Sequence, residues 1–487
     1  MPGLAPSNVI IIHPDLGIGG AERLIIDVAL ALQNRGHRVT IYTSHRDKTH
    51  CFDEARDGTL DVRVRGNTIF PAHFFGRFHI LMASLRQLHL TASLLTELES
   101  RGKSTAQDQS APGEEDQDDI FIVDQLPACV PILKSFARPR KSRRQRILFY
   151  CHFPDQLLAR RNEGGSLLRL AKALYRFPFD WFEGWAMSAS DRVVANSHFS
   201  RGVLHGVFGA DKLGDVEVVY PCVDTNAGTK ALAEEPEEAL WTGKKILLSI
   251  NRFERKKDMG LAIRAYNGLG EGKRKGTRLV IAGGYDNRVQ ENVQYHQELD
   301  NLAKDLGLRT ATTKTVVSAL SIPDDINVLF LLSVPTAFKN TLLAQSKLLL
   351  YTPINEHFGI VPVEAMLAGL PVLASNTGGP LETIVEGETG WLRDALAVEE
   401  WTAVMDKVLY GMSQIEVDRI AAAGKARAER EFSLTALEDR LEDEISTMLS
   451  VDRRPFHGWQ QILVALAVSG SFLAVVVPFL LRSVYFN

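Results

Sequence analysis

Two glutamates, Glu356 and Glu364, lie eight residues apart in a segment that is rich in glycine. Gly359 lies between them, and Gly378 and Gly379 follow a little later. Glycine lets a backbone approach a ligand closely. A helix that begins after Gly359 would direct its positive N-terminus at phosphate groups, and Glu364, about one turn inside it, could accept hydrogen bonds from two ribose hydroxyls. The pattern predicts a nucleotide site, and an ordinary loop with surface glutamates is the alternative.

A cationic loop provides the second candidate group. Arg252 and Lys257 lie five residues apart, directly after the predicted strand Lys245–Asn251. Two cations at that spacing can neutralise a diphosphate leaving group. Lys256 competes with Lys257 for the role of the lysine, and a basic loop that is merely solvated is the simpler interpretation.

A glycine turn near the N-terminus contains Gly19 and Gly20, between a predicted strand and a predicted helix. Exposed backbone N–H groups at a helix N-terminus attract phosphate. The turn departs from the dinucleotide fingerprint, because Glu22 stands where that pattern needs a third glycine. A hydride-transfer enzyme is therefore disfavoured, and a plain tight turn is the remaining alternative.

Short apolar runs alternate with amphipathic helical patterns in both halves of the chain, which predicts two domains with parallel sheets. The strands predicted in the first half are Val9–His13, Val39–Thr43, a short strand within Asp53–Arg65, Ile120–Val123, Ile147–Cys151 and Arg192–Ala195. Those in the second half are Lys245–Asn251, Arg278–Gly283, Ile326–Leu331, Leu348–Thr352 and Pro371–Ser375. The pattern dissolves around Asp224–Glu238, which is the predicted boundary between the domains.

Composition agrees with two domains. The chain has 487 residues and 45% hydrophobic content, which is enough for more than one core. The formal net charge is −4, so no global basic field indicates nucleic-acid binding. The four cysteines are scattered and form no C-x-x-C pair, which argues against a zinc site or a disulfide scaffold.

The glutamate pair, the Arg252–Lys257 pair and the glycine turn together resemble the family 4 glycosyltransferases of GT-B fold. The resemblance covers roughly residues 8–450. Within that family, the segments Tyr351–Pro362, Asn251–Lys257 and Tyr150–Asp155 look most like the mannosyltransferases that extend dolichol-linked oligosaccharides through alpha-1,3 and alpha-1,6 linkages.

This resemblance implies an α/β protein with two Rossmann-like domains that face a cleft. Residues 1–225 would form the acceptor domain, residues 240–430 the nucleotide-sugar domain, and residues 431–450 a return helix. The implied reaction is a retaining transfer of mannose from GDP-mannose to a dolichyl-diphosphate-linked oligosaccharide, with no metal or other cofactor required. The resemblance implies that the protein forms a complex with other mannosyltransferases of the pathway, and it implies no nucleic-acid partner.

The resemblance also implies roles for single residues. Glu356 and His152 would be catalytic, with Glu356 at the hydroxyls of the donor sugar and His152 near that sugar. Arg252 and Lys257 would hold the diphosphate, and Glu364 would hold the ribose. Gly359, Ile360 and Val361 would offer backbone amides to the sugar and phosphate of the donor. Gly19 and Gly20 would form an acceptor or phosphate loop.

The C-terminal tail is the predicted membrane anchor, over residues 460–481. Ile462–Leu481 has no charged residue, and as a helix of 20 residues it would span roughly 30 Å of hydrocarbon. Trp459 and Tyr485 flank it at interfacial positions. We expect the body of the protein to lie on the cytosolic face of the endoplasmic reticulum. A buried core helix is the alternative.

Four further segments leave alternatives open. Residues 101–119 read as a disordered insert, whose Asp116-Gln-Asp118 resembles a metal-binding motif by chance. Residues 69–98 and 167–185 are aromatic-rich and fit interfacial helices or core helices equally well. Lys134–Arg146 holds seven basic residues and could contact lipid or simply be solvated.

Two other functions remain open alternatives. One is a different family 4 transferase with the same donor, such as an alpha-1,2-mannosyltransferase. The other is a non-catalytic membrane scaffold with a transferase fold, which the joint presence of Glu356, Glu364, Arg252 and Lys257 disfavours.

Overall fold

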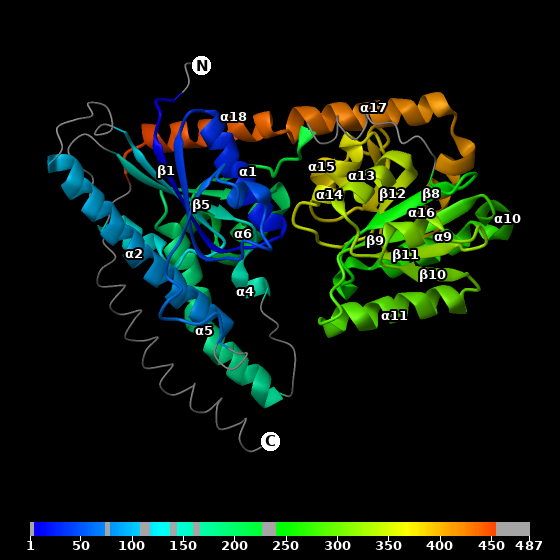
Figure 1. Ribbon diagram of the computed structural model, residues 1–487, viewed down its shortest axis with the longest axis horizontal. Coiled ribbons are helices and arrows are strands. Elements are labelled where there is room, and N and C mark those ends of the chain that lie inside the picture. Colours follow the sequence, from blue (N-terminus) through cyan, green and yellow to red (C-terminus); the bar gives the residue numbers. More distant parts are fainter. Residues whose placement is uncertain are drawn as a thin grey trace. The chain divides into compact units, whose positions relative to one another are not determined.

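The computed structural model describes residues 4–73, 78–107, 117–136, 144–158, 166–225 and 240–453. The chain forms two compact units, coloured along the sequence in Figure 1. Unit 1 combines Met1–Tyr220 with Leu437–Asn487, and unit 2 is Pro221–Ala436. The polypeptide therefore leaves unit 1, forms all of unit 2, and returns.

Unit 1 is built on one parallel sheet of seven strands in the order β3-β2-β1-β4-β5-β6-β7. The strands are β1 Asn8–Leu16, β2 Arg38–Arg46, β3 Asp61–Val64, β4 Asp119–Asp124, β5 Gln145–Cys151, β6 Arg192–Ala195 and β7 Val216–Val218. The central strands are buried on both faces, as parallel strands covered by helices must be. Strand order reverses between β1 and β4.

Helices cover this sheet. They are α1 Gly20–Asn34, α2 His79–Gln107, α3 Val130–Phe136, α4 Asp155–Leu158, α5 Ser166–Ser188, α6 His198–Phe208 and α7 Ala210–Leu213, with a short 3-10 turn at Asp53–Ala55. Ser197 caps α6, because its hydroxyl accepts a hydrogen bond from the amide of Ser200 over 3.0 Å at the start of that helix.

Unit 2 repeats the architecture with the strand order β10-β11-β9-β8-β12-β13-β14. Its strands are β8 Lys245–Ile250, β9 Thr277–Gly283, β10 Thr310–Thr313, β11 Val328–Leu332, β12 Ser346–Tyr351, β13 Val372–Ser375 and β14 Gly390–Arg393. Every neighbouring pair is parallel. Strand order reverses between β8 and β12.

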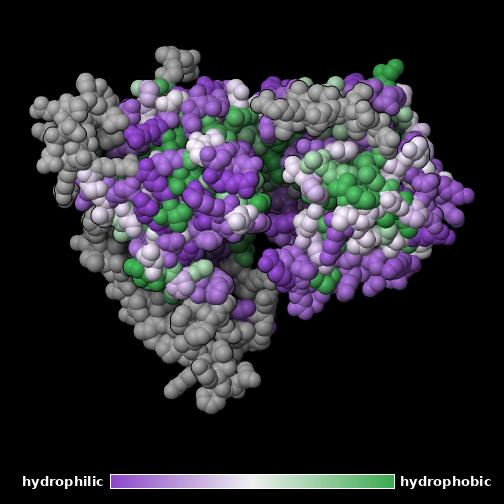
Figure 2. Space-filling model, viewed as in Figure 1, coloured by the Kyte–Doolittle hydropathy of each residue, from purple (hydrophilic) through white to green (hydrophobic). Residues whose placement is uncertain are grey.

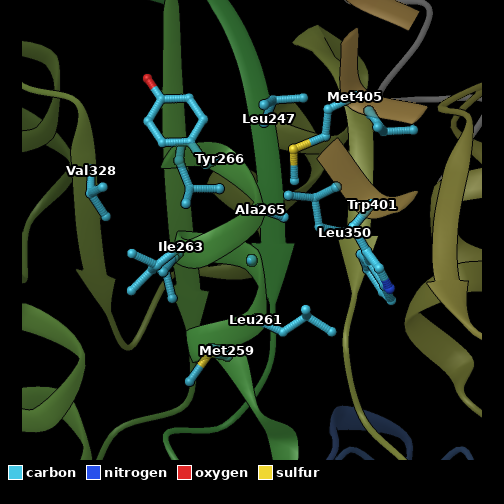
Figure 3. Close-up of a cluster of buried hydrophobic side chains, with 14 of the residues drawn as sticks. Leu247, Met259, Leu261, Ile263, Ala265, Tyr266, Val328, Leu350, Trp401 and Met405 are labelled. Atoms are coloured by element: carbon cyan, nitrogen blue, oxygen red, sulfur yellow. The ribbon is translucent and has the colours of Figure 1, made fainter. Parts of the chain in front are cut away.

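The core of unit 2 forms where helices meet this sheet. Figure 3 shows Leu247 and Leu350 of the strands beside Ile263 of α9 and Trp401 and Met405 of α16, all buried. The helices are α9 Met259–Gly268, α10 Gly270–Arg274, α11 Gln290–Asp305, α12 Val316–Leu320, α13 Thr336–Gln345, α14 Ile360–Leu367, α15 Pro380–Thr383, α16 Val398–Asp406 and α17 Gln414–Glu431, with a 3-10 turn at Arg255–Lys257 and a π-helical turn at Lys407–Gly411. Figure 2 shows the outer face of α11 as largely hydrophilic, as expected for an amphipathic helix.

The C-terminal helix α18, Leu434–Ser450, completes unit 1. It buries Leu437, Leu441 and Ile445. Its acidic face pairs with residues near the amino ends of the strands: Arg35 with Glu438, His37 with Glu442 over 2.6 Å, and Arg192 with Glu444 over 2.6 Å. Arg146 donates to the carbonyl of Met448 over 3.1 Å, so a cation also caps the helix C-terminus.

Each predicted strand overlaps an observed one, and the prediction of two parallel sheets is confirmed. Helix α2 continues to Gln107, so it extends into the segment predicted to be a disordered insert, and residues 108–116 lie outside the described residues. None of the described helices combines the length and the hydrophobicity that a membrane span requires. The predicted anchor, residues 460–481, lies outside the described residues.

Candidate active site

The switch point of unit 2 lies between β8 and β12, where the sheet is extended in opposite directions. The loops that follow two such strands diverge at the carboxyl edge of a parallel sheet and leave a crevice for ligands. Here the loop after β8 carries Arg252 and Lys257, and the loop after β12 carries Glu356. The fold therefore brings the two sequence-predicted groups to one place.

Lys257 and Glu356 are in direct contact through the lysine ammonium and one carboxylate oxygen. Both side chains are mostly buried, with 13% and 22% of their surfaces exposed. Burial alone would raise the pKa of Glu356, but the Lys257 ammonium outweighs it, and the pKa lies below its usual range. Glu356 is therefore ionised at neutral pH, and Lys257 is positioned by it.

Neighbouring groups hold these two loops in place. The Thr352 hydroxyl donates to the backbone carbonyl of Lys257 over 2.7 Å and so ties one loop to the other. The amide of Gly379 donates to the carbonyl of Glu356 over 2.7 Å. A Cβ on Gly378 would lie 2.5 Å from that same carbonyl oxygen, so the close approach needs glycine. The glycine pair thus packs against the backbone of the loop that carries Glu356.

Helix α14 begins immediately after this loop. Gly359 precedes it with φ of 86°, a left-handed conformation that favours glycine, and no side chain caps the helix. The amides of Ile360 and Val361 belong to the first turn, where a helix supplies no acceptors. Within the helix, Glu364 accepts a hydrogen bond from Lys339 of α13 over 2.8 Å.

Arg252 and Lys256 differ from Lys257. Their side chains are 69% and 70% exposed, and both pair with Glu254, over 3.5 Å and 3.0 Å. Burial would raise the pKa of Glu254, but these cations lower it below its usual range. Of the two candidate lysines, Lys257 is therefore the one that contacts the predicted catalytic carboxylate.

The switch point of unit 1 carries a second buried cluster. Asp124 ends β4, and its carboxylate binds two histidines: Nε2 of His152 over 2.7 Å and Nδ1 of His13 over 2.7 Å. His13 lies in β1 and His152 follows β5, so three neighbouring strands contribute one residue each. Asp124 and His13 are fully buried, whereas 18% of the His152 side chain is exposed.

The charges of this cluster support one another. Burial alone would raise the pKa of Asp124, but the two histidines hold it below its usual range. Burial would lower the pKa of His152, whereas the Asp124 carboxylate, and more weakly Glu22, raise it. Nε2 of His13 also faces an acceptor, the carbonyl of Asp15 at 3.1 Å. The cluster therefore favours a proton on His152 and a negative charge on Asp124.

The glycine turn lies at the same edge of the sheet. Gly19 precedes α1 in an extended conformation, and Gly20 is the first residue of the helix. A Cβ on Gly19 would lie 2.3 Å from a carboxylate oxygen of Glu22, so this side chain folds back over the turn. A carboxylate thus already lies near the helix N-terminus, where negative charge is stabilised.

Two other predicted features can be placed in part. Asp118 of the Asp-Gln-Asp segment pairs with Arg144 over 2.7 Å, and Asp116 lies outside the described residues. Of the seven cations in Lys134–Arg146, three are described and have protein partners: Lys134 pairs with Asp191, and Arg144 and Arg146 donate to carbonyls at the end of α18. Within the described ranges no three or more His, Cys, Asp or Glu side chains are arranged so that they could hold a metal ion.

Sequence families match both units. The family described as Glycosyltransferase Family 4 matches residues 18–95 and 114–227, and the family described as Glycosyl transferases group 1 matches residues 233–427. Together these two models cover most of the chain. The chain is therefore a glycosyltransferase.

Curated relatives decide the family more narrowly. A Neurospora crassa protein named alpha-1,3/1,6-mannosyltransferase alg-2 is 50% identical over 451 residues, which are 91% of this chain and 90% of the relative. The chain belongs to the alpha-1,3/1,6-mannosyltransferase family. Members from Schizosaccharomyces pombe and Saccharomyces cerevisiae, both named alpha-1,3/1,6-mannosyltransferases, are 41% and 40% identical over 99% and 93% of this chain, and over 90% and 87% of their own lengths. These names favour the alpha-1,3/1,6 reading over the alpha-1,2 alternative.

Solved structures agree on the fold of this family member. A crystal structure of Anabaena Alr3699/HepE with UDP and glucose has a TM-score of 0.60 at 19% identity, covering 91% of this chain and 100% of that one. An alpha,alpha-trehalose 6-phosphate synthase from Burkholderia multivorans has a TM-score of 0.62 at 17% identity, covering 93% and 100%. The likeness supports the predicted GT-B fold.

Sequence reasoning missed several residues of this mannosyltransferase. Asp124 and His13 contact each other although they are 111 residues apart in the chain, so the contact can be recognised only once the order of the strands is known. Lys339 lies 25 residues before Glu364 on another helix. Tyr351 ends a strand as an ordinary apolar residue, yet it interacts with Glu356, and burial raises its pKa far above the usual range. A polar residue at the end of a buried strand, such as Asp124, was the one available signal.

Proposed function

We propose that the chain transfers mannose from GDP-mannose to a dolichyl-diphosphate-linked oligosaccharide. It would add one alpha-1,3 and one alpha-1,6 linkage, with retention of configuration, in assembly of the N-glycan precursor. This proposal rests on the contact between Lys257 and Glu356 at the β8/β12 switch point. It also rests on the 50% sequence identity between this chain and a protein named as a mannosyltransferase.

The donor would bind to unit 2. Departure of the diphosphate leaves negative charge on phosphate and positive charge on the sugar. Lys257 and Arg252 are the cations for the first charge, and the Glu356 carboxylate is the counter-charge for the second. Groups that meet both developing charges from a preorganised site lower the barrier most. The amides of Ile360 and Val361 and the carboxylate of Glu364 would hold phosphate and ribose.

The acceptor would bind to unit 1, beside His152 and the Gly19–Gly20 turn. The pKa of His152 is raised, so at neutral pH its imidazole ring carries its proton more often than a free histidine does. Such a ring can donate to a sugar hydroxyl or a phosphate oxygen. We propose that the catalytic body lies on the cytosolic face of the endoplasmic reticulum membrane, with residues 460–481 in the bilayer. The reaction would need no metal ion.

One assay tests donor, acceptor and linkage together. The purified chain is incubated with GDP-mannose or, separately, with UDP-sugars, and with a phytanyl-diphosphate oligosaccharide that carries one core mannose. Linkage-specific mannosidases and mass spectrometry then identify the product. We expect transfer from GDP-mannose alone, unaffected by a metal chelator, to give a product with both linkages.

A Glu356→Gln variant, which keeps the shape of the side chain, should lose roughly 100-fold or more of the turnover. Transfer from a UDP-sugar, a single linkage of another type, or near-normal turnover of the Glu356→Gln variant would each contradict the proposal.

A further inference from the structure

Strained backbone adjoins both members of the Lys257–Glu356 pair. In the part of the chain that the structure describes, six residues other than glycine have a left-handed backbone, with φ between 39° and 63°: Phe78, Gln125, Trp241, Asp258, Ser333 and Asn355. Such conformations are costly for a residue with a side chain, and they concentrate at functional sites. Asp258 directly follows Lys257, and Asn355 directly precedes Glu356. Each member of the pair thus has a strained neighbour.

The types of these two neighbours fit their conformation. Aspartate and asparagine tolerate the left-handed region better than other residues with a side chain. The side chain of Asn355 is exposed, and that of Asp258 is 36% exposed, with Arg264 at 3.3 Å. Burial of the two side chains therefore does not impose the strain, and the path of the backbone is the feature that needs an explanation.

The loop that carries Asn355 is held by the segment that follows β13. The Ser375 hydroxyl donates to the backbone carbonyl two residues before Asn355. The amide of Asn355 donates to the Thr377 hydroxyl over 3.3 Å, and the amide of Gly379 donates to the carbonyl of Glu356 over 2.7 Å. Backbone groups before, at and after the strained residue are therefore fixed by one neighbouring segment.

The turn that carries Asp258 is fixed on both sides as well. The carbonyl of Lys257 accepts a hydrogen bond from the Thr352 hydroxyl over 2.7 Å. The amide of Met259, the first residue of α9, donates to the hydroxyl of Tyr295 in α11 over 2.8 Å. A strained residue persists only where its surroundings determine its conformation in this way.

The strained residues determine where the two charged side chains point. If Asn355 relaxed to an extended or right-handed conformation, the Cα–Cβ bond of Glu356 would change direction, and its carboxylate would move away from Lys257. Relaxation at Asp258 would likewise move Lys257 relative to α9. Groups held in place before the substrate arrives lower the barrier more than groups that must reorganise.

We propose that Asp258 and Asn355 are positioning residues, whose left-handed backbone directs the Lys257 ammonium and the Glu356 carboxylate into one site. Their side chains need not touch the substrate. The proposal rests on the proposed function in one respect, because it assigns the Lys257–Glu356 pair to the reaction of the donor.

A comparison of glycine with alanine at position 355 tests the role of the conformation. Both substitutions remove the asparagine side chain, but glycine adopts the left-handed region freely and alanine does not. Asn355→Ala should lower kcat with GDP-mannose roughly 10-fold to 100-fold, because the carboxylate is displaced. Asn355→Gly should keep kcat within about threefold of the unsubstituted chain.

Position 258 provides an independent second comparison, since both Asp258→Ala and Asp258→Gly remove the contact with Arg264. The alanine variant should again lose turnover and the glycine variant should keep it. Gly307→Ala is the matched control. Gly307 has φ of 73°, is exposed, and follows the C-terminal end of α11, at the opposite edge of the sheet from the site. This variant should be less stable and keep its kcat.

Three kinetic results would overturn the proposal. Equal losses in the glycine and alanine variants would mean that the side chains matter and the conformation does not. Normal turnover in both alanine variants would mean that the site tolerates relaxation. A loss of kcat in Gly307→Ala as large as in Asn355→Ala would mean that any backbone strain in unit 2 has the same effect.

A stability measurement separates this proposal from the proposed function. Urea unfolding midpoints of Lys257→Met, Glu356→Gln and the double variant give the coupling between the two side chains. We expect this coupling to persist when Asn355→Gly is added and to be lost when Asn355→Ala is added. An unchanged coupling beside Asn355→Ala would refute the positioning role. Absence of mannose transfer by the unsubstituted chain would contradict the proposed function alone, and the coupling would still test the positioning.

Discussion

Lys256 and Lys257 are neighbours in the chain with different surroundings. The 3-10 turn at Arg255–Lys257 directs Lys257 to Glu356 and leaves Lys256 at the surface with Glu254. The sequence left these two lysines as competitors. One residue of a 3-10 turn rotates a side chain by about 120°, and no spacing rule specifies where such a turn begins.

Replacing each lysine by methionine should separate them. Lys257→Met removes a cation that is mostly buried against the candidate catalytic carboxylate, and turnover should fall roughly 100-fold to 1,000-fold. Lys256→Met removes an exposed partner of Glu254 and should change turnover by about twofold at most. Steady-state kinetics with GDP-mannose measures both. Similar losses in the two variants would exclude a special role for Lys257.

Asp124 should control His152 without touching substrate. In Asp124→Asn the carboxylate that raises the pKa of His152 is gone, so the imidazole loses its proton at lower pH. If protonated His152 supports the reaction, the alkaline limb of kcat/KM against pH should move to lower pH, and the maximal value should fall roughly tenfold to 100-fold.

Asp15→Asn is the matched control for that experiment, because Asp15 is 52% exposed and pairs with Arg86. Its pH profile should stay unchanged. A profile of Asp124→Asn that keeps its shape while thermal stability falls would mean that Asp124 is only a structural residue.

At the scale of elements, the central strands were predictable and some edge strands were not. The missed strands β7, β10 and β14 all lie at sheet edges. β10, Thr310–Thr313, contains three threonines and is only partly buried, so it shows no apolar run. Central strands such as β4 and β12 are buried on both faces and therefore read as continuous apolar stretches.

The aromatic helices illustrate what periodicity alone leaves open. Residues 167–185 fitted a core helix and an interfacial helix equally well, because α5 has aromatic side chains on both faces. Only the structure shows that Tyr175 contacts Phe78 outside the helix, whereas Phe177 and Trp181 are 71% and 51% exposed. Sequence patterns record amphipathicity, and they do not record which of two apolar faces has a partner.

The Glu183 carboxylate of α5 accepts hydrogen bonds from the amides of Asp155 and Gln156 in α4, and this buried contact should make stability depend on pH. Burial raises the pKa of Glu183 to about 7 from its usual 4.5, so the folded state takes up a proton more readily than the unfolded state. The free energy of unfolding should therefore fall as pH rises from about 4.5 to about 7. Above that range the contribution is fully lost.

Glu183→Gln should remove this part of the pH dependence, because glutamine stays neutral. Denaturant unfolding of both proteins at about pH 5.5 and about pH 8 should show a smaller loss in the variant, by roughly 1–3 kcal/mol. Glutamine cannot accept both hydrogen bonds from α4, but this loss is the same at both pH values. It therefore cancels when the pH dependence of the variant is compared with that of the unsubstituted protein. Parallel slopes would show that Glu183 does not titrate in this range.

At the scale of the whole molecule, helix α18 belongs to unit 1 although it follows unit 2 in the sequence. It lies along the amino ends of the unit 1 strands, whereas Asp124 and His152 lie at the carboxyl ends. The two segments that join the units also pair with each other, through the amide of Val223 and the carbonyl of Phe432 at 2.8 Å.

Weakening α18 should therefore loosen unit 1 selectively. Leu441 is fully buried, and Leu441→Ala should destabilise unit 1 by about 2–5 kcal/mol. Hydrogen exchange should accelerate in β1 and β2 and stay unchanged in β8 and β12. The control Leu396→Ala, whose leucine is 86% exposed in unit 2, should have little effect. Equal acceleration in both sheets would contradict this division.

The order of synthesis follows from that same helix. A ribosome makes residues 1–220 first, then 221–436, and only afterwards the segment that completes the first unit. The nascent N-terminal sheet must therefore wait, with the binding surface of α18 bare, while the second unit emerges and can fold by itself. A chaperone that shields the amino ends of those strands during translation would cover apolar surface that α18 buries in the finished fold.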